Sequence, residues 1–411
     1  MHYLYYSNSI QKSGDNTLLL LSLLIYITVS YFGGFTTYAN YIIFPIVALW
    51  IPFLNSMYVH LPRNEKTFTT ISIVFLLFTL IYRVFGYSTH ESTSVYRDIS
   101  WIMSGIISVY ALRLFSKRDQ STLFLTFTLV ITILLVVLIS IGRAVDVTDA
   151  SETANAWVGS MFMLLTGFSL IVFIHVKPLY LRAIFLSLIL LTLYLNFYIL
   201  QRGTNVIFTI FEIGLIIVFS LKYRFLIRVM TIGTLITFFI VYTSGIYIQI
   251  FDWLADVIPS ERLAERFLAI SYTLQYGDVE AGGGSLEARD RLMHISWNTF
   301  TSNIGYFLFG AGAQRGNTVI GHHSFFLDTL ASYGIIGGFL MIAYFKKQYQ
   351  IIMSKINREH ERVLYSQCTV IFVFYLLRNF YGDMSTTNIN FMLLIYFPLV
   401  IKLLLSFKEK K

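Results

Sequence analysis

The side chains of this chain best suited to chemistry are arginines and histidines that border long apolar stretches. Arg202 and Gly203 lie just after an apolar run, and His322 and His323 lie just before another. A guanidinium group is a planar, permanently charged fork that can bind two phosphate oxygens at once. Histidine exchanges a proton near neutral pH. This combination suits the binding of a phosphorylated group by arginine and the transfer of a proton by histidine.

Two further arginines occur as Arg289-Asp290-Arg291 in a predicted helix over residues 286–300. Successive residues of a helix are about 100° apart, so Arg289 and Arg291 diverge by about 200° and cannot both reach one point. We expect one of them to meet the substrate and the other to pair with Asp290 or Glu287. The sequence leaves open which arginine has which role.

The histidines do not form a recognisable metal site. Adjacent side chains such as those of His322 and His323 diverge, and no other histidine or acidic cluster has matching spacing. Cys368 is the single cysteine, which excludes an intramolecular disulfide and a cysteine-based zinc site. We therefore expect neither a metal ion nor another cofactor.

The elements that position these residues are membrane helices. Hydrophobic residues make up 56% of the chain and charged residues only 13%, whereas soluble domains carry about 25% charged residues. The net charge of +8 follows from the retention of lysine and arginine on the cytoplasmic side of a membrane, and we expect no nucleic-acid partner. The first apolar run begins at Thr17 and leads into further spans, which predicts a membrane helix and no cleaved signal peptide.

Apolar windows predict an all-α polytopic membrane protein with about twelve transmembrane helices. Residues 1–245 hold the first nine, residues 246–323 form a large extracytoplasmic loop, and residues 324–411 hold the last three and a cytoplasmic tail. The windows lie at 17–35, 38–58, 68–87, 98–115, 121–141, 157–176, 179–199, 204–221, 226–247, 324–345, 363–381 and 388–407.

Lysine and arginine in the short loops predict the orientation. With both termini in the cytoplasm, every lysine falls inside, and the basic residues left outside are all arginines. These are Arg83, Arg97, Arg143, Arg202, Arg262, Arg266, Arg289, Arg291, Arg315 and Arg378. Topology alone would deplete both residue types from the outer side. Arginine persists there either because it tolerates partial burial better than lysine or because it binds phosphate.

The long outer loop divides at a flexible joint, Gly282 to Ser285. Before the joint, Asp252 to Tyr276 predicts an amphipathic helix. This helix either lies along the outer membrane interface or packs on the helix bundle with a solvated charged face.

Four elements occur in order along residues 200–345. They are Arg202-Gly203 after a span, an arginine in the long outer loop, Gly310-Ala311-Gly312, and a motif from His323-Ser324 through Leu327 and Leu330 to Gly334 and Gly337. Together they resemble the O-antigen polymerase and ligase family of bacterial membranes. The first half of the chain agrees with this family in hydropathy only.

The resemblance implies a glycosyltransferase of the GT-C type, with its active site at the outer face of the bacterial cytoplasmic membrane. Such an enzyme polymerises undecaprenyl diphosphate-linked oligosaccharides into O-antigen or capsular polysaccharide, alongside a flippase and a chain-length regulator. Arg202, Arg291 and His323 match the family's arginines and histidine. The sequence departs in having Ile295 where a tryptophan is usual, with Trp297 two residues further on, and Ser324 in place of the commoner asparagine.

As a mechanism, we expect Arg202 and Arg291 to bind the diphosphate while His323 orients or deprotonates the attacking sugar hydroxyl. Attack opposite the lipid phosphate would invert the anomeric centre. Arg289, His322, Arg378 and Arg315 are further substrate-binding candidates.

Other interpretations remain open. Arg202 could instead extend to headgroup phosphates, and His323 could cap or pack the start of a helix. An O-antigen ligase acting on a lipid A-core acceptor has the same motifs. A lipid-linked glycan flippase also needs a basic cavity, but we expect its arginines to be spread over many spans.

Overall fold

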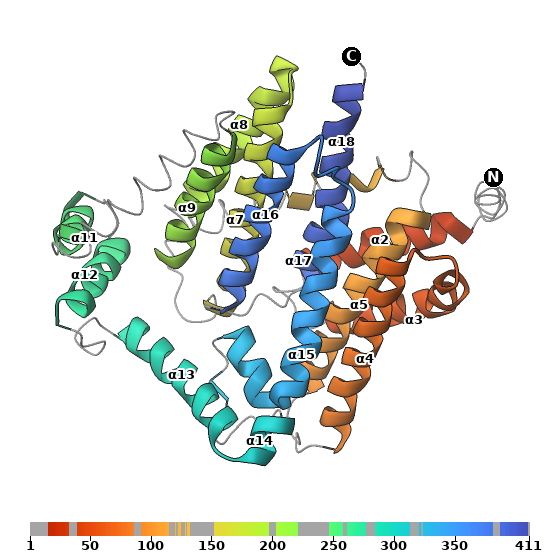
Figure 1. Ribbon diagram of the computed structural model, residues 1–411, viewed down its shortest axis with the longest axis horizontal. Coiled ribbons are helices and arrows are strands. Elements are labelled where there is room, and N and C mark those ends of the chain that lie inside the picture. Colours follow the sequence, from red (N-terminus) through yellow and green to blue (C-terminus); the bar gives the residue numbers. More distant parts are fainter. Residues whose placement is uncertain are drawn as a thin grey trace.

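The computed structural model describes residues 15–32, 39–85, 92–114, 120, 122–124, 128, 130–131, 152–196, 203–220, 246–257, 261–276, 284–312, 320–321, 324–380 and 387–409. Every regular element in these ranges is a helix, which confirms the predicted all-α class. The helices are α2 Asp15–Phe32, α3 Ala39–Tyr58, α4 Arg63–Phe85, α5 Ser92–Leu114, α7 Glu152–His175, α8 Leu179–Tyr194, α9 Gly203–Ser220, α11 Ile246–Val257, α12 Glu261–Tyr276, α13 Gly284–Thr301, α14 Ile304–Phe309, α15 Phe325–Met353, α16 Arg362–Phe380, α17 Thr387–Phe391, the π-helix η3 Met392–Tyr396 and α18 Phe397–Glu409 (Figure 1).

Three helical segments in the described part of the chain are long and apolar enough to cross a membrane. They are Arg63–Ile81 of α4, Phe325–Met353 and Arg362–Phe380. Shorter apolar helices cover Leu18–Val29, Ile99–Arg113, Met161–His175, Leu179–Tyr194, Val206–Ser220 and Ile389–Lys402. These helices support the membrane character of the protein. The predicted spans at 121–141 and 226–247 lie largely outside the described residues.

Helix α15 runs through the centre of the bundle, between α4 and α5 on one side and α16 on the other (Figure 1). Its aromatic side chains pack on Trp101 of α5, whose ring lies 4.9 Å from that of Tyr344 and 5.3 Å from that of Phe325. Gly105, one turn further along α5, has no side chain to keep the Tyr344 hydroxyl away from the α5 backbone. Ring packing and a close helix contact therefore hold Phe325 and Tyr344 of α15 against the same part of α5.

A buried hydrogen-bond network ties the same helices together. The Asn390 Nδ2 group donates to the Trp101 carbonyl at 2.6 Å and to Ser104 Oγ at 3.1 Å, while Gln348 Nε2 donates to Asn390 Oδ1 at 3.0 Å. Polar groups inside an apolar bundle need such partners, because an unmade hydrogen bond there is costly. The network links α5, α15 and α17.

One buried acid has no such partner. Glu212 of α9 is fully buried, and neither carboxyl oxygen has a hydrogen-bond partner in the described part of the chain. A Cβ placed on Gly167 of α7 would meet this carboxyl group, and Ile371 of α16 lies beside the same position. Glu212 is therefore enclosed where α7, α9 and α16 meet.

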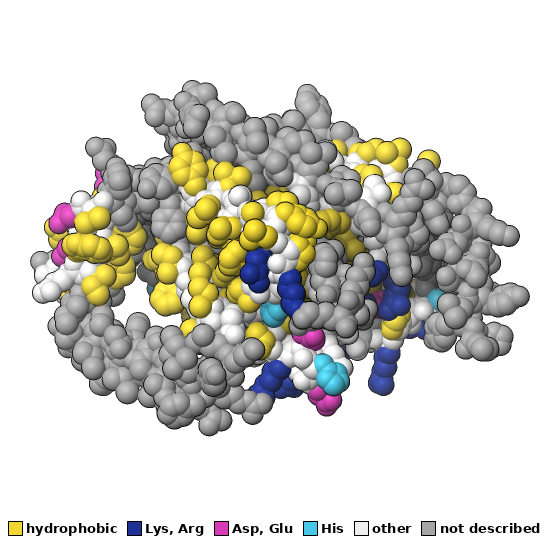
Figure 2. Space-filling model, turned by 90° about the horizontal axis from the view of Figure 1, so that it is seen from above, with side chains coloured by type: hydrophobic (Ala, Val, Ile, Leu, Met, Phe, Trp, Pro, Cys, Tyr) yellow, Lys and Arg dark blue, Asp and Glu magenta, His cyan; other side chains and the backbone are white. Residues whose placement is uncertain are grey.

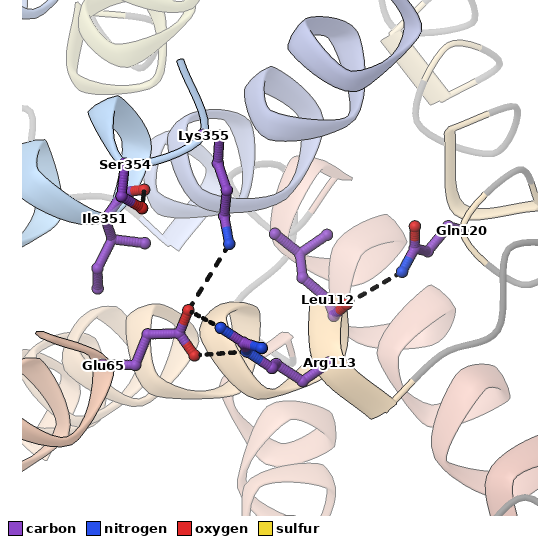
Figure 3. A network of polar contacts seen from close by, with 7 residues as sticks. All are labelled: Glu65, Leu112, Arg113, Gln120, Ile351, Ser354 and Lys355. Carbon is purple, nitrogen blue, oxygen red and sulfur yellow. Dashed lines mark hydrogen bonds and ion pairs between the residues drawn. The ribbon is translucent and has the colours of Figure 1, made fainter. Parts of the chain in front are cut away.

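Lysines and arginines mark one end of the bundle, which we call the basic end. There Glu65 of α4 receives two hydrogen bonds from Arg113 of α5, at 2.7 and 2.8 Å, and lies 3.7 Å from Lys355 beyond α15 (Figure 3). The surface seen from above carries Lys and Arg side chains with histidines and acids among them (Figure 2).

Another network belongs to the basic end. His175 at the end of α7 contacts Gln367 near the start of α16, and Gln367 donates to Ser220 at the end of α9. The helix directions follow: α4 and α16 begin at the basic end, whereas α5, α7, α9 and α15 end there.

The outer-loop prediction needs one correction. The single helix predicted from Asp252 to Tyr276 is two helices, α11 and α12, which pack together through Phe251 and Phe267 with ring centroids 5.9 Å apart. Pro259 lies between them in the sequence and disfavours helical backbone in the residue before it. Helix α13 agrees with the helix predicted over 286–300 and begins two residues earlier.

Candidate functional site

The predicted histidine–glycine motif leads into α15 beside the end of α16 that lies away from the basic end, where Phe326 packs on Phe380. Helix α15 is interrupted at Gly334, whose φ of 64° and ψ of −166° lie far from helical values. This backbone conformation is accessible almost only to glycine. A Cβ at Gly334 would also overlap the backbone of Leu308 and Phe309 in α14. The interruption therefore divides α15 into a short first segment and a long second one, and α14 packs where the two segments meet (Figure 1).

The Gly-x-Gly element pairs with this first segment. Ala311 N–H donates to the Ala331 carbonyl at 2.8 Å, and Gly312 N–H donates to the Ser332 carbonyl at 3.0 Å. Gly310 and Gly312 have φ values of 80° and 75°, and a Cβ at Gly310 would overlap the Ser332 backbone. The missing side chains allow backbone to approach backbone here, so these glycines have a packing role.

Helix α15 starts with a reciprocal cap. Ser324 is the N-cap residue, and its hydroxyl accepts a hydrogen bond from Leu327 N–H at 3.3 Å. Asp328 reaches back and accepts one from Ser324 N–H at 3.0 Å. Serine and asparagine are both strong N-cap residues. Ser324 can therefore cap the helix as well as the asparagine that is commoner at this position of the motif. The cap belongs to Ser324, so capping is not the role of His323.

Helix α13 is attached to this cap. The Ser296 hydroxyl donates to Asp328 Oδ1 at 2.5 Å and accepts a hydrogen bond from Gly321 N–H at 2.9 Å. A Cβ at Gly321 would overlap the backbone of Leu292, one turn before Ser296. Ser296, Gly321 and Ser324 are all buried. Gly321 and Ser324, which flank His322 and His323 in the sequence, are therefore tied to one face of α13, Gly321 directly and Ser324 through Asp328.

This contact bears on the choice between the two arginines of α13. Given about 100° per residue, position 289 is about 60° around the helix from Leu292 and about 20° from Ser296. Position 291 is about 100° and about 140° from the same two residues, and the Arg291 side chain is exposed. Position 289 therefore shares the face that meets Gly321, and position 291 points away from that face.

Arg378 belongs to the same end of the bundle. It lies in the last turn of α16, is only 4% exposed, and precedes Phe380, whose ring is 5.8 Å from that of Phe326 in α15. A cation in the last turn of a helix is favoured by the carbonyl groups that end there. Arg378 is two residues before Phe380 and therefore points to another side of α16, so its substrate-binding role stays a prediction.

The remaining candidates, Arg202, Arg315, His322 and His323, lie outside the described residues. Arg202 directly precedes Gly203, the first residue of α9, and this is the end of α9 opposite Ser220. Within the described part of the chain no group of three or more His, Cys, Asp or Glu residues is placed to hold a metal ion. Because both histidines fall outside that part, the absence of a metal stays a prediction.

Sequence reasoning missed Ser296 and Asp328, which join the motif to the arginine-bearing helix. A weaker signal for Asp328 was available, since acids are favoured in the first turn of a helix, although Asp328 lies one residue beyond the capping-box position. Ser296 had no such signal.

No family model matches the chain, and no protein of curated function matches its sequence. The resemblance to O-antigen polymerases and ligases therefore rests on the sequence motifs, and the function is a proposal.

Proposed function

We propose that this protein is a polytopic membrane glycosyltransferase with about twelve spans and a GT-C-like arrangement. It polymerises undecaprenyl diphosphate-linked oligosaccharide repeat units into O-antigen or capsular polysaccharide. The active site lies at the end of the bundle that bears Ser324, which faces the outside of the bacterial cytoplasmic membrane, and the basic end faces the cytoplasm, as lysine-rich ends do.

The observation that carries this proposal is the attachment of the histidine-bearing segment to the arginine-bearing helix. Ser296 and Asp328 connect α13 to the first turn of α15 and hold Gly321 and Ser324 on either side of His322-His323. This attachment supports a site in which an arginine that binds phosphate and a histidine that moves a proton act together. This is what glycosyl transfer from a diphosphate requires.

In the proposed reaction, a hydroxyl of the acceptor sugar attacks the anomeric carbon of the donor on the face opposite the lipid diphosphate. The new C–O bond forms as the bond to phosphate breaks, and the diphosphate departs with the electron pair. His323 accepts the hydroxyl proton, and Arg202 and an arginine of α13 neutralise the departing diphosphate. The geometry of α13 favours Arg289 over Arg291 for that contact, and Arg378 completes the positive surroundings.

The test is reconstitution of the purified protein in liposomes with a lipid-linked repeat unit as the only glycan. A ladder of products that differ by one repeat unit is expected, and it should disappear with His323→Ala or Arg202→Ala at normal expression. Normal polymer length and yield in both variants would show that His323 and Arg202 do not form the active site.

The same assay separates the polymerase from its nearest alternative. A ligase makes no product until a second acceptor, such as a lipid A-core, is added. Movement of the lipid-linked glycan across the bilayer without any new glycosidic bond would instead indicate a transporter.

A further inference from the structure

A pocket of about 490 Å³ lies at the basic end, where α3 ends and α4 begins. It is separate from the proposed active site, because the start of α15 packs through Phe325 on Trp101, which lies beside Phe75 of α4. Phe75 is twelve residues beyond Arg63, hence about 18 Å along the helix. The pocket is lined by Tyr58, Leu61, Arg63, Lys66, Thr67, Thr70 and Ile71.

One face of α4 supplies most of this lining. Arg63, Lys66, Thr67 and Thr70 follow one another at the three- and four-residue spacing that places side chains on one side of a helix. The pocket is therefore cationic where α4 begins.

The hydroxyl groups of the pocket already use their hydrogens. Thr67 Oγ1 donates to the Arg63 carbonyl at 2.8 Å, and Thr70 Oγ1 donates to the Lys66 carbonyl at 2.9 Å. Because Thr70 has only one hydroxyl hydrogen, the 2.7 Å contact between Tyr58 and Thr70 is a hydrogen bond donated by Tyr58. The side-chain donors left for a ligand are the guanidinium of Arg63 and the ammonium of Lys66.

These two cations are not neutralised by the nearby acid. Glu65 points to another side of α4, where Arg113 and Lys355 bind it (Figure 3). Neither Arg63 nor Lys66 has an acidic partner among the residues that the structure describes. The pocket therefore attracts an anion.

Beyond the pocket, the same face of α4 becomes aliphatic and stays exposed. Val74, Leu77 and Ile81 continue the helical spacing from Thr70, and their exposed fractions are 46%, 53% and 54%. Leu61 and Ile71 supply apolar surface within the pocket itself. A cationic opening followed by an exposed aliphatic strip matches a phospholipid, with its phosphate at the helix end and an acyl chain along the helix.

We propose that this pocket binds the headgroup of an anionic phospholipid in the leaflet at the basic end. Arg63 and Lys66 contact the headgroup phosphate, and an acyl chain lies along Val74, Leu77 and Ile81. A free phosphate ion shares the first contact but not the second, so the aliphatic strip selects the lipid. This site does not depend on the proposed enzymatic activity.

The test measures thermal unfolding of the full-length protein in detergent, titrated with phosphatidylglycerol, phosphatidylcholine or inorganic phosphate. Phosphatidylglycerol should raise the melting temperature, and phosphatidylcholine or inorganic phosphate at equal concentration should do so far less. In the double variant Arg63→Gln/Lys66→Gln the apparent affinity for phosphatidylglycerol should fall about 30-fold, since each surface cation contributes about five-fold to anionic lipid binding.

The matched control is Lys346→Gln/Lys347→Gln, which removes two positive charges from α15 in its half toward the basic end, outside the pocket. It should keep the wild-type affinity. If the double variant is not monodisperse, Lys66→Gln alone should show the five-fold loss. An unchanged affinity in the pocket variants, an equal loss in the control, or an equal effect of phosphatidylcholine would overturn the proposal. If inorganic phosphate raised the melting temperature as much as phosphatidylglycerol, the ligand of the pocket would be a free anion and the lipid proposal would be wrong.

Discussion

The Ser296 hydroxyl donates a 2.5 Å hydrogen bond to the carboxylate of Asp328, and this contact joins α13 to the first turn of α15. The same serine oxygen accepts the N–H of Gly321, and the other Asp328 oxygen accepts the N–H of Ser324. One pair of side chains therefore holds both described ends of the segment that contains His322 and His323. We infer that its function is to position the histidines relative to the arginines of α13.

We predict that Ser296→Ala lowers both activity and stability. The substitution leaves the Gly321 N–H without its acceptor and removes one donor from Asp328, at a cost of about 1–3 kcal/mol in the free energy of unfolding. A segment displaced by about 1 Å loses about 100-fold in rate, so polymer yield should fall about 10- to 100-fold. Both quantities are measured on purified protein, by thermal unfolding and by the polymerisation assay.

Thr301→Ala is the matched control, because it removes an exposed hydroxyl of the same helix that donates to the Trp297 and Asn298 carbonyls, both within α13. It should change neither quantity appreciably. Activity of Ser296→Ala at the wild-type level would show that the Ser296–Asp328 contact does not position the site.

The two arginines of α13 should differ in importance. Position 289 shares the helix face of Ser296, so Arg289→Ala should reduce kcat/KM about 100-fold or more, as expected for a lost charged contact to the transition state. Arg291, which is exposed on another side of the helix, should lose less than about 5-fold as Arg291→Ala. Steady-state kinetics with a lipid-linked repeat unit decides between them, and a larger loss for Arg291 would reverse the assignment.

Gly334→Ala should be strongly destabilising. Its positive φ and its contact with the α14 backbone leave no room for a Cβ, so the free energy of unfolding should fall by more than about 2 kcal/mol. Gly214→Ala in α9 is the comparison, since a Cβ there meets nothing within 4 Å and alanine stabilises a helix by about 0.5–1 kcal/mol relative to glycine. Thermal unfolding of both variants in detergent measures the difference, and equal stabilities would contradict the observed backbone at Gly334.

The start of α15 shows how far the sequence alone predicts the site. The motif places a helix start after His323, and the helix does begin at Phe325 behind the Ser324 cap. The interruption at Gly334 was not predictable, because a glycine in an apolar stretch is compatible with a continuous helix or with a break. The contact of Gly334 with the backbone of Leu308 and Phe309, which the sequence does not show, accompanies the break.

The choice between Arg289 and Arg291 also depends on a contact between residues far apart in the sequence. Helical spacing predicts that Arg289 and Arg291 diverge, yet it does not say which side of α13 meets the rest of the protein. The contact of Leu292 with Gly321 supplies that direction. Sequence patterns therefore predicted the all-α class and the helix that became α13, whereas tertiary packing determines how the elements lie relative to one another.

Gly167 and Glu212 should be energetically coupled inside the bundle. A Cβ at Gly167 would overlap the Glu212 carboxyl group, and because Glu212 is fully buried its side chain has little space into which it could move. Gly167→Ala should therefore lower the free energy of unfolding by about 1–3 kcal/mol. In a Glu212→Ala background the two closest obstructing atoms are gone, Ile371 remains at 3.2 Å, and the added methyl group fills part of the space left behind.

A double-mutant cycle measures this coupling from the thermal or denaturant unfolding of the four proteins in detergent. We expect the effect of Gly167→Ala to be halved or reversed when residue 212 is alanine. Glu212→Gln, which keeps the shape, should be about as stable as the wild type, because both side chains leave their buried polar atoms without partners there. In that background Gly167→Ala should remain as damaging as in the wild type, because the clash depends on side-chain volume. Additive effects in the alanine cycle would show that Glu212 does not lie against Gly167.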